Sequence, residues 1–296
     1  MPHTTDILTA PSKINLYLEI KDVRDDGYHE LLTLFLPVAE PHDTLTVSTN
    51  GVGFTLECPD FPELETSENL LYKTWESFGK TTGYQPHLHI LLDKCIPMGA
   101  GLGGGSSDAA TLLSWLNHKA GDAALPADAL NALAVKLGAD VPFFLQGGPA
   151  WAEGIGEKLT SATVDLHGMH LVLVCPNVHV NTGWAYGAWD AMNMADGKLR
   201  RDRKTPLTSS AAGNKESLPV PAVGVFNDFE APVFQEFPIL REIKEELLRQ
   251  GAAAAAMSGS GASLFGLFRN RSHAQSAADS FRGAGHDAHM NRIEFP

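Results

Sequence analysis

A dense run of glycines constrains this chain more than any other feature of its sequence. Residues 97–108 read Pro-Met-Gly-Ala-Gly-Leu-Gly-Gly-Gly-Ser-Ser-Asp, with five glycines in the seven positions 99–105. Glycine loses more backbone freedom on folding than any other residue, so a run this dense needs a structural or functional reason. It follows a β-type segment at 87–92 and precedes apolar residues at helical spacing from about 106 to 119. This order favours a strand, a tight loop and a helix over a flexible linker.

The loop and the helix that follows it predict a phosphate site. The start of a helix offers backbone N–H groups without intrahelical partners and the positive end of the helix dipole. Glycines let a phosphate group approach those amides closely, and Ser106 and Ser107 can cap the helix or donate to phosphate oxygens. Gly99, Gly101 and Gly104 match the dinucleotide spacing, but no second strand with an acidic end follows the helix. This disfavours an NAD-dependent oxidoreductase, and the lack of Lys-Ser or Lys-Thr after the glycines excludes a Walker A loop.

The net charge limits the partners of the chain. Its 296 residues contain 22 Lys and Arg against 35 Asp and Glu, a formal net charge of −13. An acidic excess opposes attraction to nucleic acid and to anionic membranes, so we expect neither as a partner. No segment approaches the roughly 20 apolar residues of a membrane span, and the first residues do not resemble a signal peptide, which predicts a cytoplasmic protein. Cys58, Cys95 and Cys175 are widely spaced, and we expect them to be reduced and mostly packing residues.

The length predicts two domains, which we place at residues 1–162 and 163–296. Residues 195–224 combine a basic cluster with small, polar and proline residues, which predicts a solvated loop or insertion. Periodicity and end signals define the other elements. The expected strands are 12–20, 44–47, 53–57, 87–92, 171–175, 263–268 and 289–295, and the expected helices are 70–80, 106–119, 128–137 and 237–250.

Three further clusters carry polar side chains in unusual settings. In the segment 11–16, Lys13 and Asn15 alternate with apolar residues on the expected strand. A turn at 24–30 carries Tyr28 and His29, and it lacks the second histidine of a zinc-binding H-E-x-x-H motif. The small-residue loop at 257–262 lacks the pattern of a hydrolase elbow.

Together these segments resemble the GHMP kinases, a superfamily of small-molecule kinases. Its three motifs are present in order, at 11–16, 97–107 and 257–262. Within the superfamily the match is closest to the kinases that act on a cytidine diphosphate ester. The segments that carry this closer match are 26–31, 137–144 and 227–230. The chain departs from the pattern at Ser12, at Asp108 and in the long segment 195–224.

The resemblance implies an α+β, two-domain GHMP kinase fold, with the phosphate loop in a left-handed β-α-β unit and the active site in the interdomain cleft. It implies ATP-dependent phosphorylation of the 2-hydroxyl of a cytidine diphosphate ester of methylerythritol, in the non-mevalonate route to isoprenoid precursors. One alternative is another GHMP acceptor of the mevalonate, homoserine or sugar type. A non-catalytic binding protein with the same fold is another.

The resemblance also assigns roles to residues. Asp140 is expected to be the catalytic base and Lys13 its electrostatic partner. Tyr28, His29 and Asn15 are expected on the acceptor side, with Tyr186 stacking on cytosine and Trp184 as the rival for that position. ATP, accompanied by Mg²⁺ without a dedicated protein cage, is expected to bind the loop and two residues outside it. These ATP-side residues are Asn69, Lys94, Pro97, Gly99, Ala100, Gly101, Leu102, Gly103, Gly104, Gly105, Ser106 and Ser107.

Overall fold

The computed structural model describes residues 5–49, 52–195, 198–199 and 224–294. Almost all of the loop predicted at 195–224 lies outside these residues. The chain divides into two compact units, each built from several segments. Unit 1 comprises residues 1–12, 41–97 and 103–147, and unit 2 comprises residues 13–40, 98–102 and 148–296. The domain boundary placed at residues 162 and 163 stays a prediction.

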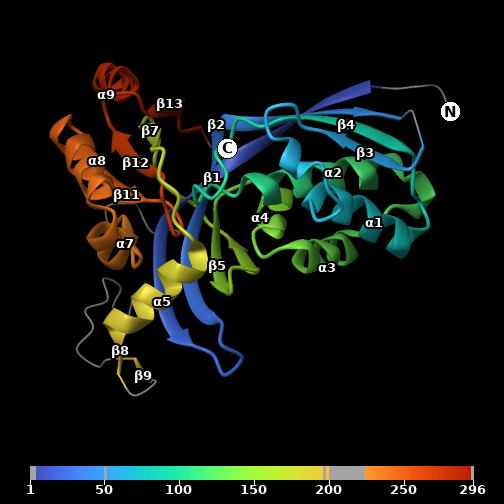
Figure 1. Ribbon diagram of the computed structural model, residues 1–296, viewed down its shortest axis with the longest axis horizontal. Coiled ribbons are helices and arrows are strands. Elements are labelled where there is room, and N and C mark those ends of the chain that lie inside the picture. The colour runs from blue at the N-terminus through green and yellow to red at the C-terminus, as the bar shows by residue number, and fades with distance from the viewer. Residues whose placement is uncertain (1–4, 50–51, 196–197, 200–223, 295–296) are drawn as a thin grey trace. The chain divides into compact units, whose positions relative to one another are not determined.

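Unit 1 packs helices on one face of a small sheet (Figure 1). Two long strands, β1 (Thr5–Val23) and β2 (His29–Ser48), each contribute one end to it. The end of β2 pairs antiparallel with β4 (Leu88–Asp93), which pairs parallel with β3 (Phe54–Glu57). The helices are α1 (Leu70–Thr82), α2 (Gly104–Lys119), α3 (Ala127–Leu137) and α4 (Val141–Gln146), with 3-10 turns at Pro62–Leu64 and Gly121–Ala123.

The sequence explains where the helices of unit 1 begin and end. Asn69 accepts a hydrogen bond from the N–H of Leu71 and so caps α1, and Gly83 ends it with a φ of 75° that favours glycine. Leu71 and Phe78 lie on the buried face of α1, at helical spacing. The helix predicted from about 106 begins two residues earlier, at Gly104.

Unit 2 contains a four-stranded antiparallel sheet in the order β11 (Ala254–Met257), β12 (Leu264–Phe268), β7 (His170–Cys175) and β13 (Asp287–Arg292). The helices α8 (Pro238–Arg249) and α9 (Arg271–Gly283) pack against it (Figure 1). The remaining helices of the described part are α5 (Thr182–Asn193) and α7 (Glu230–Glu236). None of the described helices is both long and apolar enough to cross a bilayer.

A second group of strands in unit 2 presents polar side chains to the interior. The unit 2 part of β1 lies between β2 and the short β10 (Phe226–Asn227), and β2 continues to β5 (Ala150–Gly154) and β6 (Lys158–Ser161). A further two-residue pair joins β8 (Met194–Ala195) to β9 (Lys198–Leu199). Both faces of β1 are buried here, so its polar row lies inside the unit beside the apolar one. This row comprises Lys13, Asn15, Tyr17 and Glu19.

Candidate active site

Unit 2 brings parts of the three sequence motifs into direct contact. The backbone N–H of Lys13 donates to the carbonyl of Leu102 at 3.0 Å. The buried hydroxyl of Ser258 accepts from the N–H of Asn15 at 3.2 Å and donates to the carbonyl of Gly101 at 3.0 Å. One serine therefore connects the first strand to the glycine loop, although these segments are far apart in sequence.

Gly101 is required by this contact. Its φ is 76°, and a Cβ there would lie 2.2 Å from the carbonyl oxygen of Ser258. Because an oxygen of the backbone cannot move away like the tip of a side chain, only glycine fits. The glycine at position 101 therefore allows the glycine loop to pack closely against the loop at 257–262.

The start of α2 presents unused hydrogen-bond donors. Its N-cap residue is Gly103, at a φ of 74°, and no side chain caps the helix. Within the described part of the chain, no group accepts from the backbone N–H of Gly104, Gly105 or Ser106. The hydroxyl of Ser107 is fully buried and has no hydrogen-bond partner among the described residues. Neither serine caps the helix, and these donors suit an anion such as a phosphate group.

Lys94 belongs to a buried charged triad at the base of the loop. Its ammonium donates to the carboxylate of Asp43 and, at 3.1 Å, to that of Asp108. The other oxygen of Asp43 accepts from the N–H groups of Cys95 and Ile96, at 2.7 and 2.8 Å. The triad thus joins the end of β2, the segment leading into the loop and the first turn of α2.

When both carboxylates are ionised, the triad holds two negative charges and only one positive charge. Burial raises the pKa of Asp108 to about 7, although attraction to Lys94 opposes the rise. Burial alone would lower the pKa of Lys94, but attraction to Asp108 and Asp43 outweighs it and raises that pKa. One oxygen of Asp108 is buried without a partner among the described residues. The ammonium of Lys94 is therefore held in place by the carboxylates of Asp43 and Asp108. A role of Lys94 in binding ATP stays a prediction.

Asp140 occupies the N-cap position of α4, but its side chain does not cap the helix. The preceding turn lies beside the start of α2, because a Cβ at Gly138 would lie 3.8 Å from the hydroxyl of Ser106. The helices α2 and α4 also pack together. Unit 1 therefore holds Asp140 on the turn next to the helix start with the unused donors.

Lys13 is held from several sides within unit 2. Its ammonium donates to Oδ1 of Asn15 at 2.7 Å and lies 4.9 Å from the ring centroid of Phe35. The amide of Asn15 in turn donates to the hydroxyl of Thr33 at 2.8 Å. Lys13 is only 4% exposed, so this buried lysine is kept in one orientation by its neighbours.

A second polar cluster in unit 2 forms around His29. Its Nε2 lies 2.8 Å from Oδ1 of Asp190, and its ring packs at 4.4 Å, tilted by 30°, on that of Tyr186. Trp184 lies elsewhere, with its ring edge-on to Phe237. Of the two rivals for the stacking role, Tyr186 is therefore the one beside His29.

Two predicted residues stand apart from these clusters. Tyr28 neighbours His29 in sequence, but the residue is 60% exposed. Both polar atoms of the Asn69 side chain are engaged locally, because Oδ1 caps α1 and Nδ2 donates to the carbonyl of Leu64 at 3.0 Å. Their roles toward ligands stay predictions.

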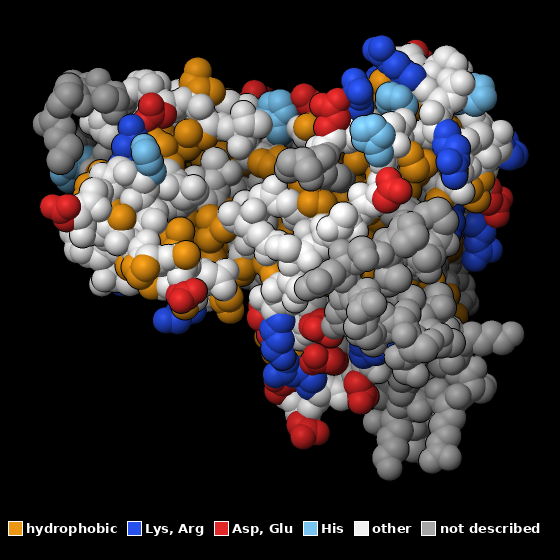
Figure 2. Space-filling model, turned by 180° about the vertical axis from the view of Figure 1, so that it is seen from behind, with side chains coloured by type: hydrophobic (Ala, Val, Ile, Leu, Met, Phe, Trp, Pro, Cys, Tyr) orange, Lys and Arg blue, Asp and Glu red, His pale blue; other side chains and the backbone are white. Residues whose placement is uncertain are grey.

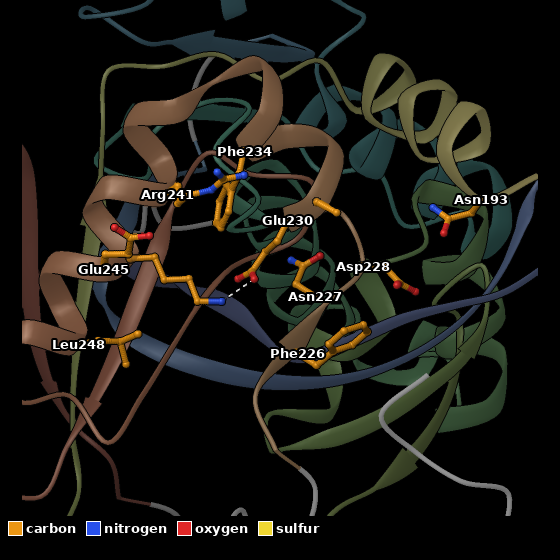
Figure 3. A pocket seen from close by; sticks show the side chains of 11 residues that line it. Asn193, Phe226, Asn227, Asp228, Glu230, Phe234, Arg241, Glu245 and Leu248 are labelled. Atoms are coloured by element: carbon orange, nitrogen blue, oxygen red, sulfur yellow. Dashed lines mark hydrogen bonds and ion pairs between the residues drawn. The ribbon is translucent and has the colours of Figure 1, made fainter. Parts of the chain in front are cut away.

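The segment 227–230 supports the loop at 257–262 through hydrogen bonds to its backbone. Asn227 donates to the carbonyls of Met257 and Gly259, both at 2.7 Å. Glu230 accepts from the N–H of Met257 at 3.0 Å and pairs with Lys244. Asn227, Glu230 and Lys244 also line a cavity of about 600 Å³ between α7, α8 and β10 (Figure 3). Its lining does not include the glycine loop, so we assign the segment a supporting role.

Comparison with known proteins now identifies the family. Residues 69–148 match the N-terminal domain of GHMP kinases, and residues 217–287 match their C-terminal domain. A 4-diphosphocytidyl-2-C-methyl-D-erythritol kinase of Solidesulfovibrio magneticus is 45% identical, over 98% of this chain and 97% of its own. The chain belongs to the GHMP kinase family. It is thus an ATP-dependent small-molecule kinase, as its motifs predict.

Solved structures agree with this GHMP kinase assignment. A crystal structure of 4-(cytidine 5'-diphospho)-2C-methyl-D-erythritol kinase superposes with a TM-score of 0.77 at 36% identity, covering 97% of this chain and 98% of the other. Homoserine kinase from Cytophaga hutchinsonii reaches a TM-score of 0.72 at 17% identity, covering 98% of this chain and 95% of its own. The second match shows the fold alone. The mixed α and β fold expected from the resemblance is confirmed.

Some residues of this GHMP kinase that organise the site were not predicted. Asp43 and Asp190 are single acidic residues outside any motif, and only the folded chain shows their contacts with Lys94 and His29. Ser258 and Asn227 lie inside segments that were recognised, but the sequence assigns them no contact.

Proposed function

We propose that this GHMP kinase transfers the γ-phosphoryl group of ATP to the 2-hydroxyl of 4-diphosphocytidyl-2-C-methyl-D-erythritol. The observation that carries the proposal is the start of α2, where three backbone N–H groups and the buried hydroxyl of Ser107 have no partner among the described residues. A polyphosphate satisfies such donors, and the named relatives supply the acceptor.

The ATP side of the proposal is the glycine loop and the first turn of α2. Here the loop amides and Ser107 would hold phosphate oxygens, while Lys94 fixes the start of α2 through its ion pair with Asp108. Among the described residues, no group of three or more His, Cys, Asp or Glu side chains could hold a metal ion. The Mg²⁺ that accompanies ATP would be held largely by phosphate oxygens and water, where it supplies charge neutralisation.

The catalytic part of the proposal rests on Lys13 and Asp140. Phosphoryl transfer passes through a loose transition state, so orientation and electrostatic stabilisation matter more than a strong base. Asp140 would orient the acceptor hydroxyl and accept its proton as the new P–O bond forms. Lys13, which already donates to Asn15, would stabilise negative charge on the reacting oxygens.

The acceptor side of the proposal is the cluster around His29. A cytosine ring needs a flat apolar contact and edge groups that complement its amino and carbonyl groups. The His29 and Tyr186 rings provide both kinds of group in one place. A small acceptor such as homoserine or mevalonate has no base for this cluster to bind. We also place the reaction in the cytoplasm, where ATP is available and where the three cysteines, none of which forms a disulfide, would stay reduced.

An acceptor panel tests the proposal. Purified protein is incubated with ATP and Mg²⁺, and ADP release is followed with the cytidine diphosphate ester, with mevalonate and with homoserine. We expect ADP release above background only with the cytidine diphosphate ester. Release with mevalonate or homoserine alone would assign another acceptor, and no release with any of them would contradict kinase activity.

A further inference from the structure

His29 is held at the start of β2 by one face of a single helix. Tyr186, Trp189 and Asp190 lie at positions i, i+3 and i+4 of α5, so their side chains share a face. The Tyr186 ring stacks on the imidazole at 4.4 Å, and the Trp189 ring meets it edge-on at 5.8 Å. The side chain of His29 is only 8% exposed. The imidazole plane is therefore fixed by packing before any ligand arrives.

Asp190 then decides which ring nitrogen carries the proton. Its Oδ1 lies 2.8 Å from Nε2 of His29. An ionised carboxylate has acceptors only, so Nε2 must be the donor of this hydrogen bond. In a neutral imidazole the other nitrogen, Nδ1, is then an acceptor. No residue in the described part of the chain forms a hydrogen bond with that Nδ1.

An acceptor at Nδ1 distinguishes between the two pyrimidines. Cytosine carries an exocyclic amino group, which donates, at the position where uracil carries a carbonyl oxygen, which only accepts. A site built to accept from that amino group leaves its own acceptor facing a second acceptor when uracil is bound. Such mismatches of buried polar groups give far more selectivity than apolar contacts do.

We propose that Asp190 is a positioning residue that fixes the Nε2–H tautomer of His29 and thereby makes the acceptor site select an amino-bearing base over a keto-bearing one. The inference rests on the proposed function, since it assumes that the base of the acceptor binds at His29. Nothing in the sequence around Asp190 signals this role.

The experiment compares the wild-type chain with Asp190→Ala and Asp190→Asn, using the cytidine diphosphate acceptor and its uridine analogue. The ratio of kcat/KM for cytidine over uridine should fall about tenfold in Asp190→Ala, the loss expected for one hydrogen bond of about 1.4 kcal/mol. The change should lie mainly in KM for the acceptor, with KM for ATP unchanged. Asp190→Asn keeps an acceptor oxygen and should retain part of the ratio. Met192→Ala changes an exposed residue of α5 and is the control, which should keep the full wild-type ratio.

A spectroscopic readout separates tautomer control from general damage to the cluster around His29. In ¹⁵N-histidine-labelled full-length protein, the His29 signals are assigned by their loss in His29→Gln. They should show protonated Nε2 and bare Nδ1 in the wild type, and a mixture in Asp190→Ala. Protonated Nδ1 in the wild type, or an unchanged cytidine preference in Asp190→Ala, would overturn this inference and leave the proposed function standing. If wild-type protein phosphorylates neither substrate, the proposed function itself is wrong.

Discussion

At the scale of single residues, the two predicted catalytic side chains are held in different ways. Lys13 is buried and donates to Asn15, whereas Asp140 stands at a helix start without capping it. Lys13→Met and Asp140→Asn should each lower turnover by about two orders of magnitude or more, because each removes charge or proton acceptance needed in the transition state. The fold should be intact by circular dichroism. Kinetics of the purified variants measure this.

Controls for these variants come from the same units. Lys21→Met changes a half-exposed lysine of the same strand, and Asp122→Asn changes an exposed carboxylate of unit 1. Both should keep nearly full turnover. Near-normal turnover in Lys13→Met or in Asp140→Asn would remove that residue from the mechanism.

Asp108 should give the stability of the protein a measurable pH dependence. Its pKa is raised from 3.8 to about 7 in the folded chain. Between these values the folded state binds more protons than the unfolded state, so the free energy of unfolding falls as pH rises from about 4 to 7. Asp108→Asn cannot ionise. Relative to this variant, the wild type should lose more than about 1 kcal/mol between pH 4.5 and 7.5 in urea unfolding. A difference that does not vary with pH would refute the raised pKa.

At the scale of elements, the sequence signals were strong where caps and apolar periodicity coincide. α1 has Asn69 at its start, Gly83 at its end and buried residues at helical spacing, and α8 buries Leu240, Ile243 and Leu247 in the same way. α9 was not predicted, because three of its four buried side chains are alanines and give a weak apolar pattern. Its cap, Asn270, was the one available signal.

The same limit applies to the site. The glycine loop and Lys13 carry recognisable motifs, and the contact among their segments was implied only by the family resemblance. Asp43 and Asp190 act through contacts between residues 51 and 161 positions apart, which no local pattern encodes.

Gly101 tests the contact between the two small-residue loops. Gly101→Ala should abolish most activity and destabilise the protein, because its Cβ would lie 2.2 Å from the carbonyl oxygen of Ser258. Gly147→Ala is the matched control, since Gly147 has a φ of 74° and no atom within 4 Å of the added Cβ. It isolates the strain of positive φ, about 1–2 kcal/mol. Equal losses of unfolding free energy in both variants would show that the loop contact is unimportant.

Asn227 tests the support behind the loop at 257–262. Asn227→Ala removes donors to the carbonyls of Met257 and Gly259, so it should destabilise the protein by about 1–3 kcal/mol and also lower kcat/KM. Asn270→Ala removes the cap of α9 and should cost about 1 kcal/mol without changing kinetics. Urea unfolding and steady-state kinetics measure both. If Asn227→Ala lowers the free energy of unfolding but leaves kcat/KM unchanged, the segment 227–230 does not support the active site.

At the scale of the whole molecule, a chain of net charge −13 must bind two polyanionic substrates. Lys and Arg side chains gather over α9 and β13 on the face drawn in Figure 2, but acidic partners neutralise two of them, in the Arg282–Asp279 and Arg292–Glu294 pairs. Under the proposed function, attraction to the substrates is therefore local and comes from Lys13, the loop amides and the metal that accompanies ATP.

The proposed reaction is phosphoryl transfer to a hydroxyl of the cytidine diphosphate ester. The most direct measurement follows the reaction of purified protein, ATP and this acceptor by ³¹P NMR. We expect a new phosphate monoester signal that grows with ADP, while the diphosphate bridge of the acceptor stays intact. Formation of ADP with inorganic phosphate alone, or cleavage of the diphosphate bridge, would contradict it.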